Sequence, residues 1–412
     1  MIERIKEMLH IVVWYFRQIK ANYYLKRIGQ KKLSKGSKKI KVGFLVQLKE
    51  VWDKQAPVYE KLCSDDRFTV SLLVVPPPGD STSTYSFEKY ETLLTFLKSK
   101  YPVADIRKAY DKHWSDLSSM GFDYIFYPRM WDSELPPEYR TKEVIKFAKT
   151  CYIPYGAGGN VYDKQFYYKR SFFLSLYINF CNSIEEINSI PTSRYKHNVF
   201  LGIPLLDCAI VRQQHIDAQN SKSNNNSILW TPRWTFEEMF GGTTFYAYKD
   251  KILSLKTKMP NINLTLRPHP LTFKNALEIG KMTEREIEDY KNSVKQHGAL
   301  FDTNAMIGDT FRQTDILITD YSSVILEFFL SGKPVIYCTK TNISFDENYK
   351  KMIQGCYIAE NWEQIEITVQ KLLNGEDNLK AARMSIIEDI KKQHLGATER
   401  IVNFLVNDAY PT

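Results

Sequence analysis

Short apolar runs alternate along most of the chain with longer stretches whose apolar residues recur at helical spacing. A short apolar run bounded by Gly, Pro or polar residues is typical of a buried strand, and spacings of three and four are typical of a helix. We expect strands at residues 40–46, 70–75, 124–127, 152–153, 316–318 and 334–337. We expect helices at residues 52–63, 85–100, 142–147 and 324–330. This alternation predicts an α/β fold with parallel sheets covered by helices on both faces.

The N-terminal segment follows a different pattern, with one apolar stripe at alternating spacings of three and four: Ile2, Ile5, Leu9, Val12, Phe16, Ile19 and Tyr23. Residues 1–41 contain twelve Lys/Arg and two Glu, a charge of +10. The longest apolar run, residues 11–16, is too short for a spanning helix of about 20 residues. A basic amphipathic helix is typical of attachment to an anionic membrane surface. The alternative is packing of the stripe on the protein itself or in a coiled coil.

The rest of the chain is nearly neutral, since the net charge of the 412 residues is +9 and the first 41 account for +10. A body without clustered positive charge disfavours nucleic-acid binding. Six cysteines without a Cys-x-x-Cys pair indicate reduced thiols in a cytosolic protein. No His-Glu-x-x-His, Walker or dinucleotide-binding glycine motif is present, so we expect no protein-held metal and no cofactor. The length is sufficient for two domains of ordinary size.

Residues 314–338 form the most informative stretch, a strand, a turn, a helix and a second strand. Polar and aromatic residues lead from the first strand into the helix: Thr319, Asp320, Tyr321, Ser322 and Ser323. Serine hydroxyls cap helix N-termini well, and the unpaired backbone N–H groups there can bind an anion. The turn therefore predicts a phosphate site, with an ordinary capped helix as the alternative.

A second motif, Leu264–Pro270, places an arginine and a histidine between prolines at the end of a strand. The prolines fix the backbone and prevent a helix from continuing through it. Arg267 offers a two-pronged donor for phosphate, and His269 can donate a hydrogen bond or a proton. A histidine between prolines can also be purely structural.

Together these motifs resemble those of the teichoic-acid glycerophosphotransferases, enzymes of Gram-positive wall synthesis that use CDP-glycerol. Two further segments fit the family in the expected order. Phe200–Asp207 contains its Gly-x-Pro-x-x-Asp pattern, and Ile228–Trp234 is similar to the first strand and loop of the family's donor domain. The resemblance implies a GT-B fold, with two Rossmann-like domains facing across a cleft and the donor held by the C-terminal one.

On this resemblance we expect four regions in the chain. They are a basic membrane-associating segment at 1–39, an acceptor domain at 40–212, a donor-binding domain at 213–378, and a C-terminal helical segment returning to the first domain at 379–412. The asparagine-rich stretch 220–226 is the expected linker region.

The resemblance also implies a reaction, the transfer of a polyol phosphate from a CDP-activated donor to a hydroxyl of a polyol-phosphate or glycan acceptor, with release of CMP. Glycerol phosphate is the first candidate, in cell-wall or capsular polymer synthesis at the cytoplasmic face of the membrane. The implied contacts of the donor diphosphate are Arg233, Arg267, Asp320, Tyr321, Ser322 and Ser323. His269 is then a catalytic residue. A glycosyltransferase using a nucleotide sugar and a 2-epimerase on the same fold are the alternatives.

The N-terminal half departs from the family, which carries a His-Gly-Thr-Pro loop whose histidine is the suspected base. Here the matching stretch is Cys151–Gly156, with Tyr155 at the histidine's position. A tyrosine with an ordinary pKa near 10 is a poor base at neutral pH. Asp53 and Arg129 also follow predicted strands of this half. Tyr155 and Asp53 are therefore the candidate catalytic residues on the acceptor side.

Overall fold

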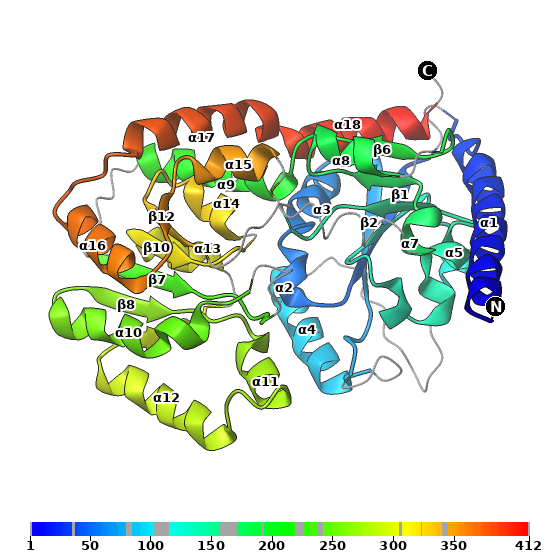
Figure 1. Ribbon diagram of the computed structural model, residues 1–412. Coiled ribbons are helices and arrows are strands. Elements are labelled where there is room, and N and C mark those ends of the chain that lie inside the picture. Colours follow the sequence, from blue (N-terminus) through cyan, green and yellow to red (C-terminus); the bar gives the residue numbers. More distant parts are fainter. Residues whose placement is uncertain are drawn as a thin grey trace. The chain divides into compact units, whose positions relative to one another are not determined.

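The structure is a computed structural model. It describes residues 2–34, 38–79, 85–101, 115–156, 171–190, 193–218, 226–236, 242–304, 307–322, 324–339, 345 and 347–410. The expected linker at 220–226 lies outside the described residues except for Asn226, and so does Ser323. The chain divides into two compact units (Figure 1). Unit 1 comprises residues 1–157, 164–207 and 396–412, and unit 2 comprises residues 158–163 and 208–395.

Unit 1 is built on a six-stranded parallel sheet of strand order β2-β1-β3-β4-β5-β6. The strands are β1 (Ile40–Val46), β2 (Phe68–Val74), β3 (Tyr124–Tyr127), β4 (Lys149–Tyr152), β5 (Ile178–Phe180) and β6 (His197–Val199). Two apolar clusters share strand β1, since Phe44 belongs to one and Leu45 to the other. Because successive side chains of a strand point to opposite faces, both faces of this sheet are buried.

Helices cover the sheet of unit 1, and the apolar periodicity of the sequence predicted only some of them. They are α1 (Ile2–Gly29), α2 (Lys49–Trp52), α3 (Ala56–Cys63), α4 (Phe87–Lys100), α5 (Thr141–Val144), α7 (Ser171–Leu174), α8 (Ile184–Ser189) and α18 (Ala397–Ala409), with the short 3-10 helices η1 (Leu117–Met120), η2 (Asp132–Glu134) and η3 (Pro137–Tyr139). The single helix expected at 52–63 is in fact two helices, separated by a turn at residues 53–55. Pro57 explains the restart, because proline fits the first turn of a helix.

Unit 2 repeats the arrangement with a parallel sheet of order β12-β11-β10-β7-β8-β9. The strands are β7 (Ser227–Thr231), β8 (Asn263–Leu266), β9 (Leu300–Phe301), β10 (Ile316–Thr319), β11 (Val335–Cys338) and β12 (Tyr357–Ala359). The helices are α9 (Pro204–Ala218), which begins in unit 1, α10 (Phe245–Lys258), α11 (Leu271–Glu278), α12 (Glu284–Gln296), α13 (Ile307–Gln313), α14 (Val324–Phe329), α15 (Glu347–Ile353), α16 (Trp362–Leu373) and α17 (Lys380–His394). The predicted α/β class with parallel sheets is confirmed.

The C-terminal segment is divided between the units, with α17 in unit 2 and α18 in unit 1. Asp207 marks the start of α18, because its carboxylate accepts hydrogen bonds from the backbone N–H groups of Gly396 at 2.8 Å and Thr398 at 2.9 Å. A carboxylate at a helix N-terminus satisfies donors that the helix itself leaves unpaired. The aspartate of the Gly-x-Pro-x-x-Asp pattern therefore has a structural role here.

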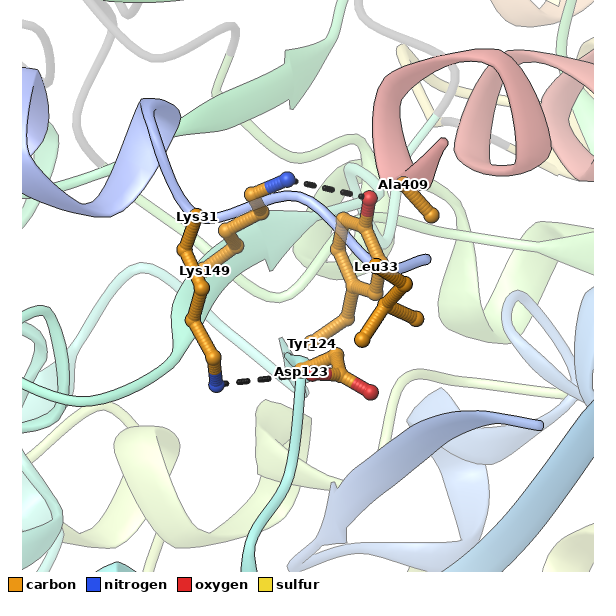
Figure 2. A pocket seen from close by; sticks show the side chains of 6 residues that line it. All are labelled: Lys31, Leu33, Asp123, Tyr124, Lys149 and Ala409. Atoms are coloured by element: carbon orange, nitrogen blue, oxygen red, sulfur yellow. Dashed lines mark hydrogen bonds and ion pairs between the residues drawn. The ribbon is translucent and has the colours of Figure 1, made fainter. Parts of the chain in front are cut away.

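The other end of α18 is fixed by a buried charge cluster. Asp408 accepts hydrogen bonds from Lys149 Nζ at 2.7 Å, the Tyr124 hydroxyl at 2.7 Å and the Tyr177 hydroxyl at 3.0 Å. Lys149 and Tyr124 also line a small pocket that Figure 2 shows, where Lys31 pairs with Asp123. Desolvation lowers the pKa of Lys149, and the charge of Asp408 opposes that shift. Lys32 pairs with Asp408 at 3.4 Å and the backbone N–H of Leu33 donates to the Ala409 carbonyl at 2.8 Å, and these contacts hold the chain that follows α1 against the end of α18.

Helix α1 packs on unit 1 through one face, on which Ala21, Leu25 and Ile28 are buried, and it contacts α7. The opposite face carries the described part of the apolar stripe, and it is open to solvent. Phe16 is 65% exposed and Tyr23 is 61% exposed. The stripe is thus not the face that packs on the protein itself. Among the described residues, no helix has both the length and the apolar character needed to cross a bilayer.

Candidate functional site

The predicted donor residues gather at the point of unit 2 where the strand order reverses. The chain moves from β7 to β8 and β9 on one side, and from β10 to β11 and β12 on the other. Strands β7 and β10 are neighbours, and Thr231 pairs with Thr319 at their ends. In open parallel sheets ligands bind outside the carboxyl ends of the strands at such a switch point. Arg233 follows β7 here, and Asp320, Tyr321 and Ser322 follow β10.

Asp320 lies at this switch point, and both oxygens of its side chain accept hydrogen bonds from other residues of the protein. The residue is only 2% exposed. One carboxylate oxygen accepts the backbone N–H groups of Arg233 and Thr244, both at 2.9 Å, and the other accepts the Thr244 hydroxyl at 2.5 Å. Asp320 thus connects the end of β10 to the loop after β7 and to the start of α10. This geometry gives Asp320 a positioning role in place of the diphosphate contact that the resemblance implied.

Arg233 is held from two sides by the residue after Asp320. Its Nη1 donates to the Tyr321 carbonyl at 3.0 Å, and its guanidinium carbon lies 4.7 Å from the centre of the Tyr321 ring. Tyr321 is buried and in turn packs edge to face on Tyr349, with ring centres 5.4 Å apart. Arg233 Nε is buried and has no hydrogen-bond partner among the described residues. A buried donor of this kind is costly unless a ligand or water satisfies it.

His269 follows β8, the strand next to β7, and its orientation is defined. Its Nδ1 accepts the backbone N–H of Leu271 at 3.1 Å, so in the neutral ring the hydrogen is on Nε2. The Trp234 ring lies 5.6 Å away, centre to centre. His269 is an exposed residue, with the Trp234 ring beside it. Desolvation, aided by the positive charge of Arg233, lowers the pKa of His269 to about 4. The unliganded protein therefore presents a neutral imidazole that can donate from Nε2.

Arg267 is less available for a ligand than its motif suggested. Its Nη1 pairs with the carboxylate of Asp302 and donates to the Asn304 carbonyl at 2.8 Å. Burial favours the neutral form of Asp302, but hydrogen bonds from Thr310, Asn304 and Arg267 outweigh it and lower its pKa below the usual value. Within the described residues Nε and Nη2 of Arg267 make no hydrogen bond and are the atoms left for a diphosphate.

The serine turn is only partly described. Ser322 accepts the backbone N–H of Val324 through its hydroxyl oxygen at 3.4 Å, and its carbonyl accepts the hydroxyl of Tyr349. The helix that follows, α14, is six residues long. A helix this short has a small dipole, so its start attracts an anion less than the start of a long helix would. Ser323 remains a prediction, since it lies outside the described residues.

The two candidates on the acceptor side belong to unit 1. Tyr155 lies in the bend after β4, where Asn182 donates to the carbonyl of Gly156 at 2.9 Å. Asp53 ends α2, and its Oδ2 pairs with Lys54 at 3.2 Å. Its Oδ1 is buried and has no hydrogen-bond partner in the part of the chain that the structure describes. The catalytic roles of Tyr155 and Asp53 stay predictions.

Two residues of the unit 2 site escaped the sequence patterns. Thr244 donates a hydrogen bond to Asp320, which lies 76 positions later in the sequence, and Asp302 accepts one from Arg267, 35 positions earlier. Neither threonine nor aspartate stands in a motif at these positions, so nothing local identifies them. Only the pairing of the strands brings them to the site.

Comparisons with known proteins agree with this architecture. A search of curated proteins finds no significant match. Among solved structures, a putative UDP-N-acetylglucosamine 2-epimerase from Listeria monocytogenes is 14% identical, with a TM-score of 0.55 and coverage of 89% of this chain and 95% of that one. The UDP-GlcNAc 2-epimerase from Neisseria meningitidis is 14% identical, with a TM-score of 0.58 and coverage of 89% and 100%. The wall teichoic acid polymerase TagF is 14% identical, with a TM-score of 0.51 and coverage of 99% and 98%.

At these identities the solved structures show the fold alone, and they confirm the expected GT-B fold. The sequence itself shows the family. A sequence model described as CDP-Glycerol:Poly(glycerophosphate) glycerophosphotransferase matches residues 192–406, just over half of the chain. The match includes both motifs on which the resemblance rested and the whole switch point of unit 2. The chain therefore belongs to the CDP-glycerol:poly(glycerophosphate) glycerophosphotransferase family.

Proposed function

We propose that this protein transfers glycerol phosphate from CDP-glycerol to a hydroxyl group of a wall or capsular polymer, and that CMP leaves. The family membership supports a transferase that uses CDP-glycerol. The arrangement of Arg233 and His269 at the switch point of unit 2 is the structural observation that carries the proposal.

The reaction forms a bond between the acceptor oxygen and the phosphorus that bears glycerol, and it breaks the bond from that phosphorus to the bridging oxygen. The bridging oxygen leaves on CMP, and the acceptor's proton passes to a base. Most of the catalytic task is stabilisation of charge on the diphosphate oxygens. Arg233, with an unpaired Nε, and the unpaired atoms of Arg267 supply positive charge. Ser322 is the further proposed contact of the diphosphate.

His269 acts in this scheme as a hydrogen-bond donor. At neutral pH a histidine whose pKa is about 4 carries no proton to give from an imidazolium. Its Nε2–H can still bind an oxygen of the diphosphate and become more favourable as charge develops there. A bound anion raises the pKa of a nearby histidine, so bound CDP-glycerol itself strengthens the hydrogen bond from His269 Nε2 to the diphosphate. Of the two roles open from the sequence, the structure supports this one.

The base that takes the acceptor's proton is proposed on the side of unit 1. Asp53 and Tyr155 are the candidates, and the unpaired carboxylate oxygen of Asp53 favours that residue. A tyrosine would need a strongly lowered pKa to serve as a base at neutral pH.

The nucleotide product separates this function from that of a glycosyltransferase. Full-length protein is incubated with CDP-glycerol, CDP-ribitol and UDP-sugars, and the nucleotides are separated. We expect CMP from CDP-glycerol and no turnover of the sugar donors. Release of a nucleoside diphosphate from a sugar donor, without CMP from either CDP-polyol, would contradict the proposal.

We also propose that α1 holds the enzyme on an anionic membrane surface. The face of α1 opposite to the protein body exposes Val12, Phe16, Ile19 and Tyr23. The exposed basic residues of the same helix include Lys20, Lys26 and Arg27. Burial of the apolar face in the headgroup region, with basic residues near anionic lipid, accounts for both features.

A further inference from the structure

The turn that follows β10 makes only long hydrogen bonds to its own neighbours in sequence. The Ser322 hydroxyl oxygen accepts the N–H of Val324 at 3.4 Å, and the Ser322 carbonyl accepts the N–H of Ile325 at 3.3 Å. Both distances exceed the usual range of about 2.7 to 3.2 Å for such bonds. These local contacts contribute little to fixing the turn, so its conformation depends on residues from elsewhere in the fold.

Tyr349 supplies this support from α15, 27 positions after Ser322 in the sequence. Its hydroxyl donates to the Ser322 carbonyl. Its ring packs edge to face on Tyr321, the residue before Ser322, and stacks on Phe345 with ring centres 5.2 Å apart. The Tyr321 ring in turn contacts the guanidinium group of Arg233. Tyr349 therefore supports both the backbone of the turn and the ring on which Arg233 lies.

Helix α15 is itself fixed against α14, the helix that begins after the turn. Arg383 is fully buried, and it donates from Nε to the Gly332 carbonyl at 2.8 Å and from Nη1 to the Gly355 carbonyl at 3.2 Å. Gly332 lies just after α14, and Gly355 lies just after α15. The approach beside Gly355 is close, since a Cβ there would lie 2.7 Å from the Phe329 ring. The position of Tyr349 is thus set by packing within unit 2.

We propose that Tyr349 is a positioning residue of the donor site, which holds the turn at residues 320–322 in the conformation that receives the diphosphate. The inference rests on the proposed function, because it gives Tyr349 a task in that reaction. Tyr349 is only 1% exposed, so it acts through Ser322 and Tyr321 and not by contact with the donor. No motif of the sequence marks this residue, and only the packing of α15 brings it to the turn.

The hydroxyl of Tyr349 matters because a carbonyl oxygen that faced the diphosphate would repel it. Both carbonyls of the turn are engaged, since that of Tyr321 accepts Arg233 Nη1 and that of Ser322 accepts Tyr349. Without this hydroxyl, the Ser322 carbonyl keeps only the long contact with Ile325 within the described part of the chain. The turn then adopts its binding conformation in only a fraction of the molecules. The apparent dissociation constant of the donor rises by the inverse of that fraction.

Calorimetry of the full-length protein with CDP tests the effect on binding. The variant is Tyr349→Phe, which removes the hydroxyl and keeps the ring. Loss of one hydrogen bond of ordinary strength predicts a rise of roughly 3- to 10-fold in the dissociation constant. The matched control is Tyr139→Phe in unit 1, because the Tyr139 hydroxyl also donates to a main-chain carbonyl, that of Ser115 at 2.7 Å. We expect the control to bind CDP as the wild type does.

The steady-state rate of CMP release separates positioning from a general effect on the fold. Tyr349→Phe should raise the KM for CDP-glycerol by the same factor and leave kcat within ~2-fold, because the turn binds the diphosphate both before and during the reaction. A purely structural role would lower kcat through loss of folded enzyme and leave KM unchanged. That result would overturn the proposal. An unchanged affinity for CDP in folded Tyr349→Phe, or an equal loss in Tyr139→Phe, would overturn it as well.

Calorimetry with UDP, run in parallel, keeps a failure of this inference apart from a failure of the proposed function. Binding of UDP but not of CDP by the wild type would refute the CDP-activated donor. The effect of Tyr349→Phe would then be measured with UDP, which carries the same diphosphate. Binding of neither nucleotide by the wild type would overturn both proposals.

Discussion

Replacement of His269 gives the sharpest prediction about the unit 2 site, because the two ring nitrogens have separate tasks. Nδ1 accepts the N–H of Leu271, and the proposed function assigns Nε2 a hydrogen bond to the diphosphate. Asparagine can keep an acceptor near Nδ1 but offers nothing at Nε2. Glutamine carries its amide N–H near the Nε2 position. The pair His269→Asn and His269→Gln therefore separates the structural hydrogen bond from the catalytic one.

The expected magnitude follows from the loss of one preorganised donor to a developing negative charge. Such a loss costs about 3 to 4 kcal/mol, or roughly 100- to 1000-fold in kcat. We expect this loss for His269→Ala and His269→Asn, and a rate within ~10-fold of wild type for His269→Gln. The assay is CMP release from saturating CDP-glycerol. The Leu271 hydrogen bond contributes about 1 kcal/mol to stability, which thermal unfolding of each variant measures separately.

Two results would refute this reasoning. Equal losses in His269→Asn and His269→Gln would show that the donor at Nε2 is not what matters, as for an imidazolium acting as proton source. A nuclear magnetic resonance titration of the free protein is the second check. With a pKa of about 4, the ring is neutral above that pH, so its signal should stay constant between pH values of about 5.5 and 8. Titration near the ordinary value of about 6.5 would contradict the assigned neutral state.

The remaining predictions concern the positive charge of Arg233, the buried carboxylate of Asp320 and the exposed apolar face of α1. Arg233→Met should weaken binding of CDP-glycerol by roughly 10- to 100-fold, as calorimetry would show, because a charged hydrogen-bond donor is lost; unchanged affinity would remove Arg233 from the donor site. Asp320→Asn should lower the free energy of unfolding in urea by about 3 kcal/mol, since a buried carboxylate that accepts several hydrogen bonds is replaced by an amide; a change below about 1 kcal/mol would disprove its positioning role. Flotation with anionic liposomes should weaken as salt rises, and Val12→Glu/Phe16→Glu should release the protein with CMP release intact; a shortened chain that begins near Lys39 and floats equally well would rule out α1 as the membrane contact.

The periodicity of the sequence predicted the α/β class and most of the longer strands, and the family resemblance added the two-domain architecture and part of the site; the short strands β5, β6, β9 and β12 were not predicted. Both parallel sheets and the residues that follow β7, β8 and β10 were predicted, because strands, turns and strand ends leave local patterns. The hydrogen-bond partners of those residues were not predicted. The pairing of Arg267 with Asp302 and the bonds from Thr244 to Asp320 join segments far apart in sequence. Such contacts depend on strand order, which periodicity does not encode.

The same limit applies to residues whose motif was recognised but whose task was not. Asp207 stood in a family pattern, yet its contacts with Gly396 and Thr398 span about half the chain. Asp320 stood beside the serine turn and was expected to face the ligand, whereas burial directs it to backbone N–H groups. In both cases the residue type fits either role, and only the fold decides between them.

The central claim is that the acceptor attacks the phosphorus bearing glycerol, and isotope labelling tests it directly. The full-length protein hydrolyses CDP-glycerol in oxygen-18-labelled water, where water takes the place of the acceptor. Mass spectrometry then measures the mass of each product. The account predicts labelled glycerol phosphate together with unlabelled CMP. Label in CMP would place the attack on the other phosphorus, and release of unlabelled CDP with labelled glycerol would show cleavage at carbon. Either result would contradict the account.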